Sequence, residues 1–127
     1  MGHSDISITL NTYTHVNLED ARDLLLRLSK QGLDFDAVVT SDDSLAVGAV
    51  KYAHAKGISV PDQLSIIGYN NSLLSRCTDP EITSIDSRVE TLCTTTVKTL
   101  MGVFSGESVP SRTTIASDLI KRNTTNF

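Results

Sequence analysis

The chain has 127 residues, of which 39% are hydrophobic and 20% charged, and its formal net charge at pH 7 is −4. This composition is typical of one soluble globular domain. It argues against wholesale disorder and against a domain that grips a nucleic-acid backbone with clustered Lys and Arg side chains. The apolar runs are too short for a transmembrane helix, and the N-terminus shows no signal peptide. We therefore expect a cytoplasmic location, with Cys77 and Cys93 as free thiols.

The first segments of the chain predict a strand and then a helix. Residues 6–14 (ISITLNTYT) alternate apolar and polar side chains, which indicates a half-exposed strand. Asn17 is expected to cap the helix that follows, and Gly32 to end it. Apolar residues at helical spacing predict one buried face on this helix: Ala21, Leu24, Leu25 and Leu28.

Two apolar strands with a helix between them are predicted next. Residues 37–39 (AVV) indicate a fully buried parallel strand, and residues 64–67 (LSII) indicate the next strand. Between them, a helix that ends at Gly57 presents small side chains that favour close packing on a sheet: Ala46, Ala49, Val50 and Ala53. The alternation of strands and helices predicts an α/β domain.

The second half of the chain contains the segment with the strongest helical period. Ser87 and Glu90 fit a capping box at the start of a helix over residues 87–104, which Gly106 closes. One face of this helix is apolar and is expected to be buried: Val89, Leu92, Cys93, Val97, Leu100, Met101 and Phe104. The flanking segments are predicted to be irregular (72–79), extended (82–85) and a last strand or pair of strands (113–122).

Two polar side chains follow consecutive predicted strands and form the candidate site. Asp42 and Asn70 are expected within side-chain reach of one cleft, because ligands of open α/β sheets bind beyond the carboxyl ends of the strands. A carboxylate and an amide suit vicinal sugar hydroxyls, since Asp accepts hydrogen bonds and Asn both donates and accepts. The spacing alone leaves open a second interpretation, in which Asp43 only caps a helix and Asn70-Asn71 only form a turn.

Other kinds of chemistry find little support in the sequence. The three histidines (His3, His15 and His54) lack metal-ligand spacing, and His54 is expected in solvent. CxxC pairs, Gly-rich phosphate loops and a nucleophile elbow are absent. We therefore predict no catalytic residue, no metal and no cofactor.

Four blocks of the sequence carry a family resemblance. They are DAVVTSDD with LAVGA (36–49), GISVPDQLSIIGYN (57–70), DPEITSI (79–85) and LIKRNT (119–124). In this order they resemble the effector-binding domain of LacI/GalR-type transcriptional repressors. The variant GYNNSL (68–73) with TSID (83–86) looks like that of the maltose-operon repressors of Gram-positive bacteria.

The resemblance implies a type I periplasmic-binding-protein-like α/β fold, with a parallel sheet flanked by helices. A small, maltose-like sugar is expected between two subdomains, in contact with Asp42 and Asn70. The family commonly has Asn and Asp at these two positions, so donor and acceptor roles are exchanged in this chain. Val89 matches a family position near the sugar, and Val16 falls near another pocket position.

The resemblance also implies that the chain is a truncated fragment. The family's helix-turn-helix, its hinge helix and the core of its first subdomain have no counterpart in the sequence, so operator DNA is expected to bind only through the missing helix-turn-helix. In the family, the helix over residues 87–104 belongs to the other subdomain. Its apolar face must either fold back over the truncated sheet or be covered by a second copy of the chain. We expect the second arrangement, in a homodimer.

A second resemblance concerns the N-terminus. Residues 2–16 (GHSDISITLNTYTHV) resemble the C-terminal box of tyrosine recombinases, in which His3 would assist phosphoryl transfer and Tyr13 would be the nucleophile. The arginines of such a site have no visible counterpart. These residues therefore form either a strand of the α/β domain or a fusion scar. Residues 1–16 are assigned to an N-terminal strand segment of undetermined origin, and 17–127 to the effector-binding domain.

The main hypothesis is an effector-sensing and dimerising fragment of a sugar-responsive regulator, which is not an enzyme. A recombinase remnant and an inactive truncated α/β domain are the alternatives.

Overall fold

The computed structural model describes residues 17–32 and 34–127, so the predicted strand at 6–14 and Val16 lie outside the described residues. The elements in chain order are α1 (Leu18–Lys30), β1 (Ala37–Val39), α2 (Asp43–Lys56), β2 (Ser65–Tyr69), the 3-10 helix η1 (Leu73–Arg76), β3 (Thr83–Asp86), α3 (Val89–Phe104) and β4 (Asp118–Ile120). The sheet order is β1-β2-β3-β4, with β1, β2 and β3 parallel and β4 antiparallel to β3. The α/β class is confirmed, with an antiparallel fourth strand at the edge.

Helix α1 begins and ends as the sequence predicts. The side chain of Asn17 accepts hydrogen bonds from the backbone of Glu19 and Asp20, and Asp20 bonds back to the Asn17 backbone, which completes a capping box. Gly32 follows the helix with φ +78°, a left-handed conformation that glycine adopts without steric cost. Helix α1 packs on α2 at Gly48, where a Cβ atom would lie 2.1 Å from the Leu18 carbonyl oxygen.

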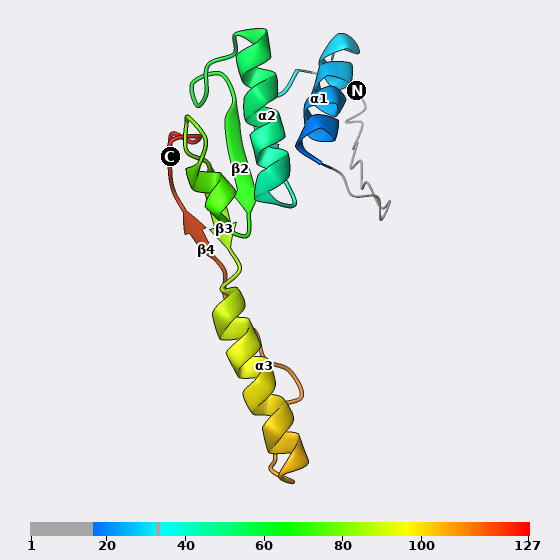
Figure 1. The fold of residues 1–127 in the computed structure, drawn as a ribbon, viewed down its shortest axis with the longest axis vertical. Coiled ribbons are helices and arrows are strands. Elements are labelled where there is room, and N and C mark those ends of the chain that lie inside the picture. The colour runs from blue at the N-terminus through cyan, green and yellow to red at the C-terminus, as the bar shows by residue number, and fades with distance from the viewer. Residues whose placement is uncertain (1–16, 33) are drawn as a thin grey trace, which may run out of the picture.

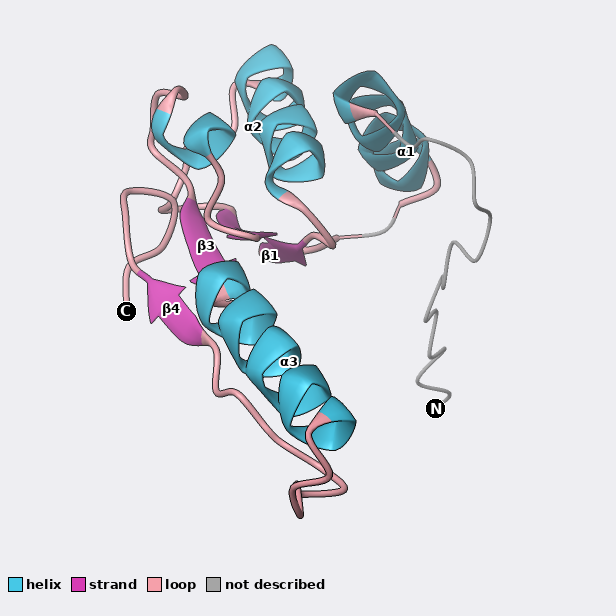
Figure 2. Ribbon diagram, turned by 60° about the horizontal axis from the view of Figure 1, so that its bottom comes forward, coloured by secondary structure: helices cyan, strands magenta, loops and turns pink. Residues whose placement is uncertain are grey.

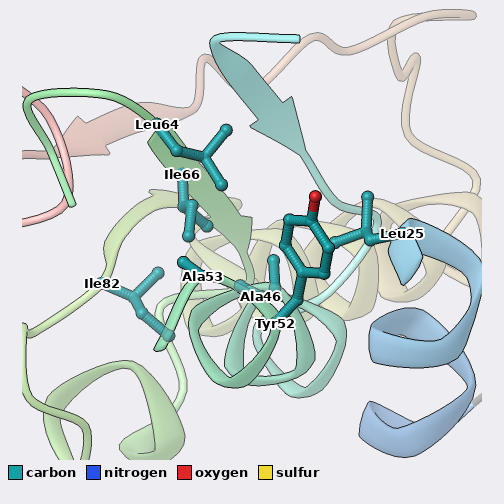
Figure 3. Packing of buried hydrophobic residues seen from close by; sticks show 8 residues of the cluster. Leu25, Ala46, Tyr52, Ala53, Leu64, Ile66 and Ile82 are labelled. Carbon is teal, nitrogen blue, oxygen red and sulfur yellow. The ribbon is translucent and has the colours of Figure 1, made fainter. Parts of the chain in front are cut away.

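The hydrophobic core lies between α2 and the sheet (Figure 3). The small residues of α2 allow its backbone to approach β2 closely, as predicted. The core consists of Leu25, Ala46, Ala49, Tyr52, Ala53, Leu64, Ile66 and Ile82. The ring of Phe35 lies 5.9 Å from that of Tyr52, centroid to centroid, and packs against this core.

Strand β1 is not fully buried, and that prediction is wrong. Only Val38 packs against the core, while Ala37 is exposed and Val39 is 68% exposed. Helices α1 and α2 both lie on one side of the sheet (Figure 2), so alternate β1 side chains point away from them. An apolar run of three residues does not reveal which of its faces is covered.

Helix α3 projects away from the rest of the domain (Figure 1). Its apolar face is exposed, including Phe104 at 74%, so the alternative in which this face folds back over the sheet is wrong. Cys93, expected to be buried on this face, is exposed as well. Cover by a second copy of the chain stays a prediction. The predicted Ser87–Glu90 capping box is also wrong. Arg88 precedes the helix in a left-handed conformation (φ +51°), and the Asp86 carboxylate accepts its backbone N–H at 2.8 Å.

The C-terminal tail ties the starts of β2 and β3 together. The Thr124 hydroxyl donates to the Ile66 carbonyl at 2.6 Å and accepts the Thr83 N–H at 2.9 Å. The Thr124 carbonyl also accepts the Ile66 N–H at 2.9 Å. Where β2 and β3 begin, these bonds take the place of backbone hydrogen bonds between neighbouring strands. Among the described residues, none of the helices has the length and hydropathy to cross a membrane.

Candidate functional site

Asp42 and Asn70 follow β1 and β2, which are neighbouring parallel strands, so both lie at the carboxyl edge of the sheet. The backbone N–H of Thr40 donates to the Ile67 carbonyl at 2.9 Å. This bond extends the pairing of the β1 and β2 segments to within two residues of Asp42. The topology therefore brings these residues to one edge, as the sequence analysis expects. Their grouping in one binding cleft remains a prediction.

Asp42, and not Asp43, is the N-cap of α2. Its Oδ1 accepts the Leu45 N–H at 2.8 Å and the Ser44 hydroxyl at 2.6 Å. In the described part of the chain, the hydrogen bonds of Asp42 leave Oδ2 without a protein donor. One oxygen therefore serves the helix, and the other can accept a hydrogen bond from a ligand.

Asn70 and Asn71 form a turn in which both residues have positive φ, +88° and +48°. Asn is among the few residues that tolerate this region, because its short polar side chain bonds locally. The Asn70 backbone N–H donates to the Ile85 carbonyl at 2.8 Å, while the Asn70 side chain is exposed. The turn thus presents an amide to solvent at the edge of the sheet.

Asp43 is the residue whose role the sequence analysis missed. It is only 2% exposed, and its carboxylate accepts the Ser72 N–H and the Ser84 hydroxyl, both at 2.6 Å. At Gly68 a Cβ atom would lie 2.2 Å from Asp43 Oδ1, so only glycine leaves room for this carboxylate. The sequence signal for this role is the pair of adjacent aspartates after a predicted strand. Capping of α2 needs only one of them, so the second is free for another role.

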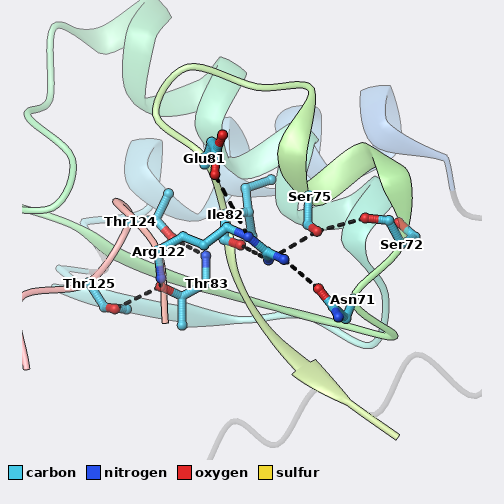
Figure 4. A network of polar contacts seen from close by, with 9 residues as sticks. All are labelled: Asn71, Ser72, Ser75, Glu81, Ile82, Thr83, Arg122, Thr124 and Thr125. Atoms are coloured by element: carbon cyan, nitrogen blue, oxygen red, sulfur yellow. Dashed lines mark hydrogen bonds and ion pairs between the residues drawn. The ribbon is translucent and has the colours of Figure 1, made fainter. Parts of the chain in front are cut away.

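A second polar network surrounds Arg122 (Figure 4). Its guanidinium, 10% exposed, donates to the Ser75 hydroxyl at 3.1 Å, to the Ile82 carbonyl at 2.8 Å and to Asn71 Oδ1 at 2.5 Å. Glu81 lies 3.8 Å from the same guanidinium. The network anchors the segment after β2 to the C-terminal tail.

Asp86 connects this network to α3. Its carboxylate accepts the Arg88 backbone N–H and the Asn71 side-chain amide, and these two hydrogen bonds, in that order, hold the pKa of Asp86 below its usual value. Arg88 also pairs with Asp118 on β4. The junction between the sheet and α3 is therefore built from alternating charges.

Val89, the third expected site residue, is the first residue of α3 and is 54% exposed at this junction. A groove of about 360 Å³ lies farther along α3, against residues 110–115, and neither Asp42 nor Asn70 lines it. Clusters of three or more metal-ligating side chains are absent from residues 17–32 and 34–127.

Residues 5–125 match the model of the periplasmic binding protein-like domain. The chain belongs to this family. A helix-turn-helix-type transcriptional regulator of Lachnoclostridium phytofermentans is 58% identical over 111 residues, which cover 87% of this chain and 33% of that relative. The chain thus spans about one third of the length of this curated relative.

Parts of solved transcriptional regulators have a similar fold. A sugar-binding transcriptional regulator of the LacI family from Escherichia coli is 27% identical, with a TM-score of 0.77 over 85% of this chain and 39% of its own. The lac repressor dimer bound to operator is 25% identical, with a TM-score of 0.80 over 86% of this chain and 38% of its own. These relatives are transcriptional regulators, which confirms the LacI-type resemblance.

Proposed function

We propose that the chain is the effector-binding part of a sugar-responsive, cytoplasmic LacI/GalR-type transcriptional regulator. Asp42 and Asn70 contact hydroxyl groups of the sugar. The observation that carries this proposal is the position of two available polar groups, Asp42 Oδ2 and the Asn70 amide, after neighbouring parallel strands. The carboxyl edge of such a sheet is where small ligands bind.

The chemistry of the two side chains defines the ligand class. Asp42 Oδ2 accepts a hydrogen bond from a sugar hydroxyl, and the Asn70 amide donates to one hydroxyl oxygen and accepts from a neighbouring hydroxyl. Val89 supplies an apolar contact to the sugar ring, and Val16 is proposed near the same pocket. A maltose-like disaccharide is the first candidate, because the sequence around Asn70 and Ser84 looks like that of maltose-operon repressors.

The proposed mechanism is a shift between two arrangements of the regulator. The effector binds between two α/β subdomains and favours the arrangement that makes more contacts with it. The exposed apolar face of α3 is a contact surface within this assembly, which we propose to be a homodimer. A helix-turn-helix, of the kind named in the relative from Lachnoclostridium phytofermentans, would make the contact with operator DNA.

Titration with sugars, followed by amide NMR spectra of the chain, tests the proposal. We expect maltose to shift the signals of Asp42, Asn70 and their neighbours, with a dissociation constant weaker than about 10 μM, because the site lies at an open edge of the sheet. Asn70→Ala should abolish the shifts. The matched control, Asn126→Ala, removes an exposed amide that bonds Asp62 elsewhere, and should leave them intact. A panel of disaccharides that moves none of these signals would falsify the proposal.

A further inference from the structure

Two backbone N–H groups of the turn after β2 depend on the buried carboxylate of Asp43. The Ser72 N–H donates directly to Asp43 Oδ2 at 2.6 Å. The Asn71 N–H donates to the Ser84 hydroxyl oxygen at 2.9 Å, and this hydroxyl in turn donates to Asp43 Oδ1 at 2.6 Å. Both carboxylate oxygens therefore hold the turn, one directly and one through Ser84.

We call the two successive hydrogen bonds from the Asn71 N–H to Ser84 and from Ser84 to Asp43 the relay. The chemistry of these groups fixes the direction of both bonds. A carboxylate can only accept, so the proton of the Ser84 hydroxyl points to Asp43 and a lone pair remains for the Asn71 N–H. The third N–H of the turn, that of Asn70, is bonded to the Ile85 carbonyl. With all three donors satisfied, the left-handed conformations of Asn70 and Asn71 are held by β3 and α2 rather than by the turn itself.

Stability of α2 does not explain this arrangement. The cap of the helix is supplied by Asp42, so Asp43 is not needed to start α2. A buried carboxylate is costly unless it is fully hydrogen-bonded, and room for it requires glycine at position 68. What these hydrogen bonds do in the structure is hold the backbone of the Asn70-Asn71 turn in one orientation.

We infer that Asp43 and Ser84 are positioning residues of the effector site, which hold the turn so that the Asn70 side chain faces the ligand beside Asp42. This inference rests on the proposed function, since it assigns a role in sugar recognition to residues that do not touch the sugar. It predicts that ligand affinity falls when the relay is cut, although every group proposed to contact the ligand is still present.

The test compares two hydroxyl deletions on adjacent residues of β3. Ser84→Ala cuts the relay, whereas Thr83→Val removes an equally buried hydroxyl that bonds Thr125 and the Arg122 N–H and has no part in the relay. Both variants should melt earlier than the wild type. Only Ser84→Ala should accelerate hydrogen exchange at the Asn71 amide and weaken maltose binding, by about tenfold for the loss of one ordering hydrogen bond.

Two further variants keep the test decisive. Ser84→Thr retains the hydroxyl and should restore both the slow exchange of Asn71 and the affinity. If Ser84→Ala does not fold, Ser84→Cys, with a similar size and a weaker hydrogen-bonding group, takes its place. The inference is overturned if Asn71 exchange or maltose affinity is unchanged in the relay variants, or if Thr83→Val changes them equally. If Asn71 exchange responds as expected but the wild-type chain binds no sugar, the positioning contact stands and the proposed function fails.

Discussion

Arg122 donates a hydrogen bond to the side chain of Asn71 across a sequence separation of 51 residues. The same Asn71 side chain donates from its amide nitrogen to Asp86 Oδ2 at 3.2 Å. One amide thus joins the C-terminal tail to the junction that leads into α3. Because Asn71 is also the neighbour of Asn70, the candidate ligand site and α3 share one polar network.

Removal of the Arg122 side chain should destabilise the domain substantially. Arg122→Ala leaves the Ile82 carbonyl, the Ser75 hydroxyl and Asn71 Oδ1 without their donor. We expect a loss of about 2–4 kcal/mol in the free energy of unfolding, because buried acceptors lose hydrogen bonds to a charged group. Urea denaturation followed by circular dichroism measures this loss. Arg112→Ala, at an exposed arginine, is the control and should change stability by less than about 0.5 kcal/mol. Equal effects of the two substitutions would show that the network contributes nothing.

The Asp86 carboxylate makes part of the folding stability of the domain depend on pH. Hydrogen bonds from the Arg88 backbone and the Asn71 side chain lower the folded-state pKa of Asp86 from 3.8. A lowered pKa means that its stabilising contribution is present above pH 3.8 and is lost as the pH falls through the folded-state pKa. We expect the NMR titration midpoint of the Asp86 carboxyl carbon below 3.8, and a higher midpoint in Asn71→Ala, which removes one of the two donors. A midpoint at or above 3.8 in the wild type contradicts the geometry described here.

Gly68 and Asp43 should be energetically coupled. Gly68→Ala places a Cβ atom against the Asp43 carboxylate, and no flexible side-chain end can yield, because both oxygens are bonded. We expect a loss of more than about 2 kcal/mol, since overpacking and a broken buried network add.

A double-mutant cycle separates this clash from the crowding of Ile82, whose Cγ2 would lie 3.2 Å from the same Cβ atom. In Asp43→Ala the obstructing carboxylate is gone, so adding Gly68→Ala should cost less there than in the wild type. Urea denaturation of the four chains gives the coupling free energy. Additive losses would show that the Asp43 carboxylate is not what excludes a Cβ atom at position 68.

The sequence predicts the local elements of this fold better than their surroundings. The ends of α1 and α2 follow from Asn17, Gly32 and Gly57, because caps and left-handed glycines are local features of the backbone. Exposure of Val39 and of the α3 face was not predictable in this way. Apolar residues show that a face needs a partner, but they do not show where in the molecule that partner lies.

The candidate site shows the same limit. The order of strand, polar residue and helix predicts that Asp42 and Asn70 reach one edge of the sheet, since parallel strands end together. The role of Asp43 depends on Ser72 and Ser84, which lie 29 and 41 residues away in the sequence, and hydrogen bonds over such distances leave no periodic pattern. The sequence features that reflect these bonds are the Asp42-Asp43 doublet and the glycine at position 68.

The exposed face of α3 leads to the prediction that the chain self-associates. Seven large apolar side chains on this helix are each about half exposed or more: Val89, Leu92, Val97, Leu100, Met101, Val103 and Phe104. Full burial of one such side chain stabilises by roughly 1.5–3 kcal/mol, and a half-exposed one can still gain about half of this. Covering the whole face is therefore comparable with the roughly 5–15 kcal/mol stability of a whole domain. We expect a dimer in sedimentation experiments at micromolar concentration. Leu100→Asp should dissociate it, because the substitution places a charge in the contact. The control is Thr91→Asp, at an exposed position on the opposite side of the same helix, which should leave the dimer intact. A wild-type chain that sediments as a monomer with its α3 face accessible to an apolar dye contradicts this prediction, and so does a Leu100→Asp variant that remains dimeric.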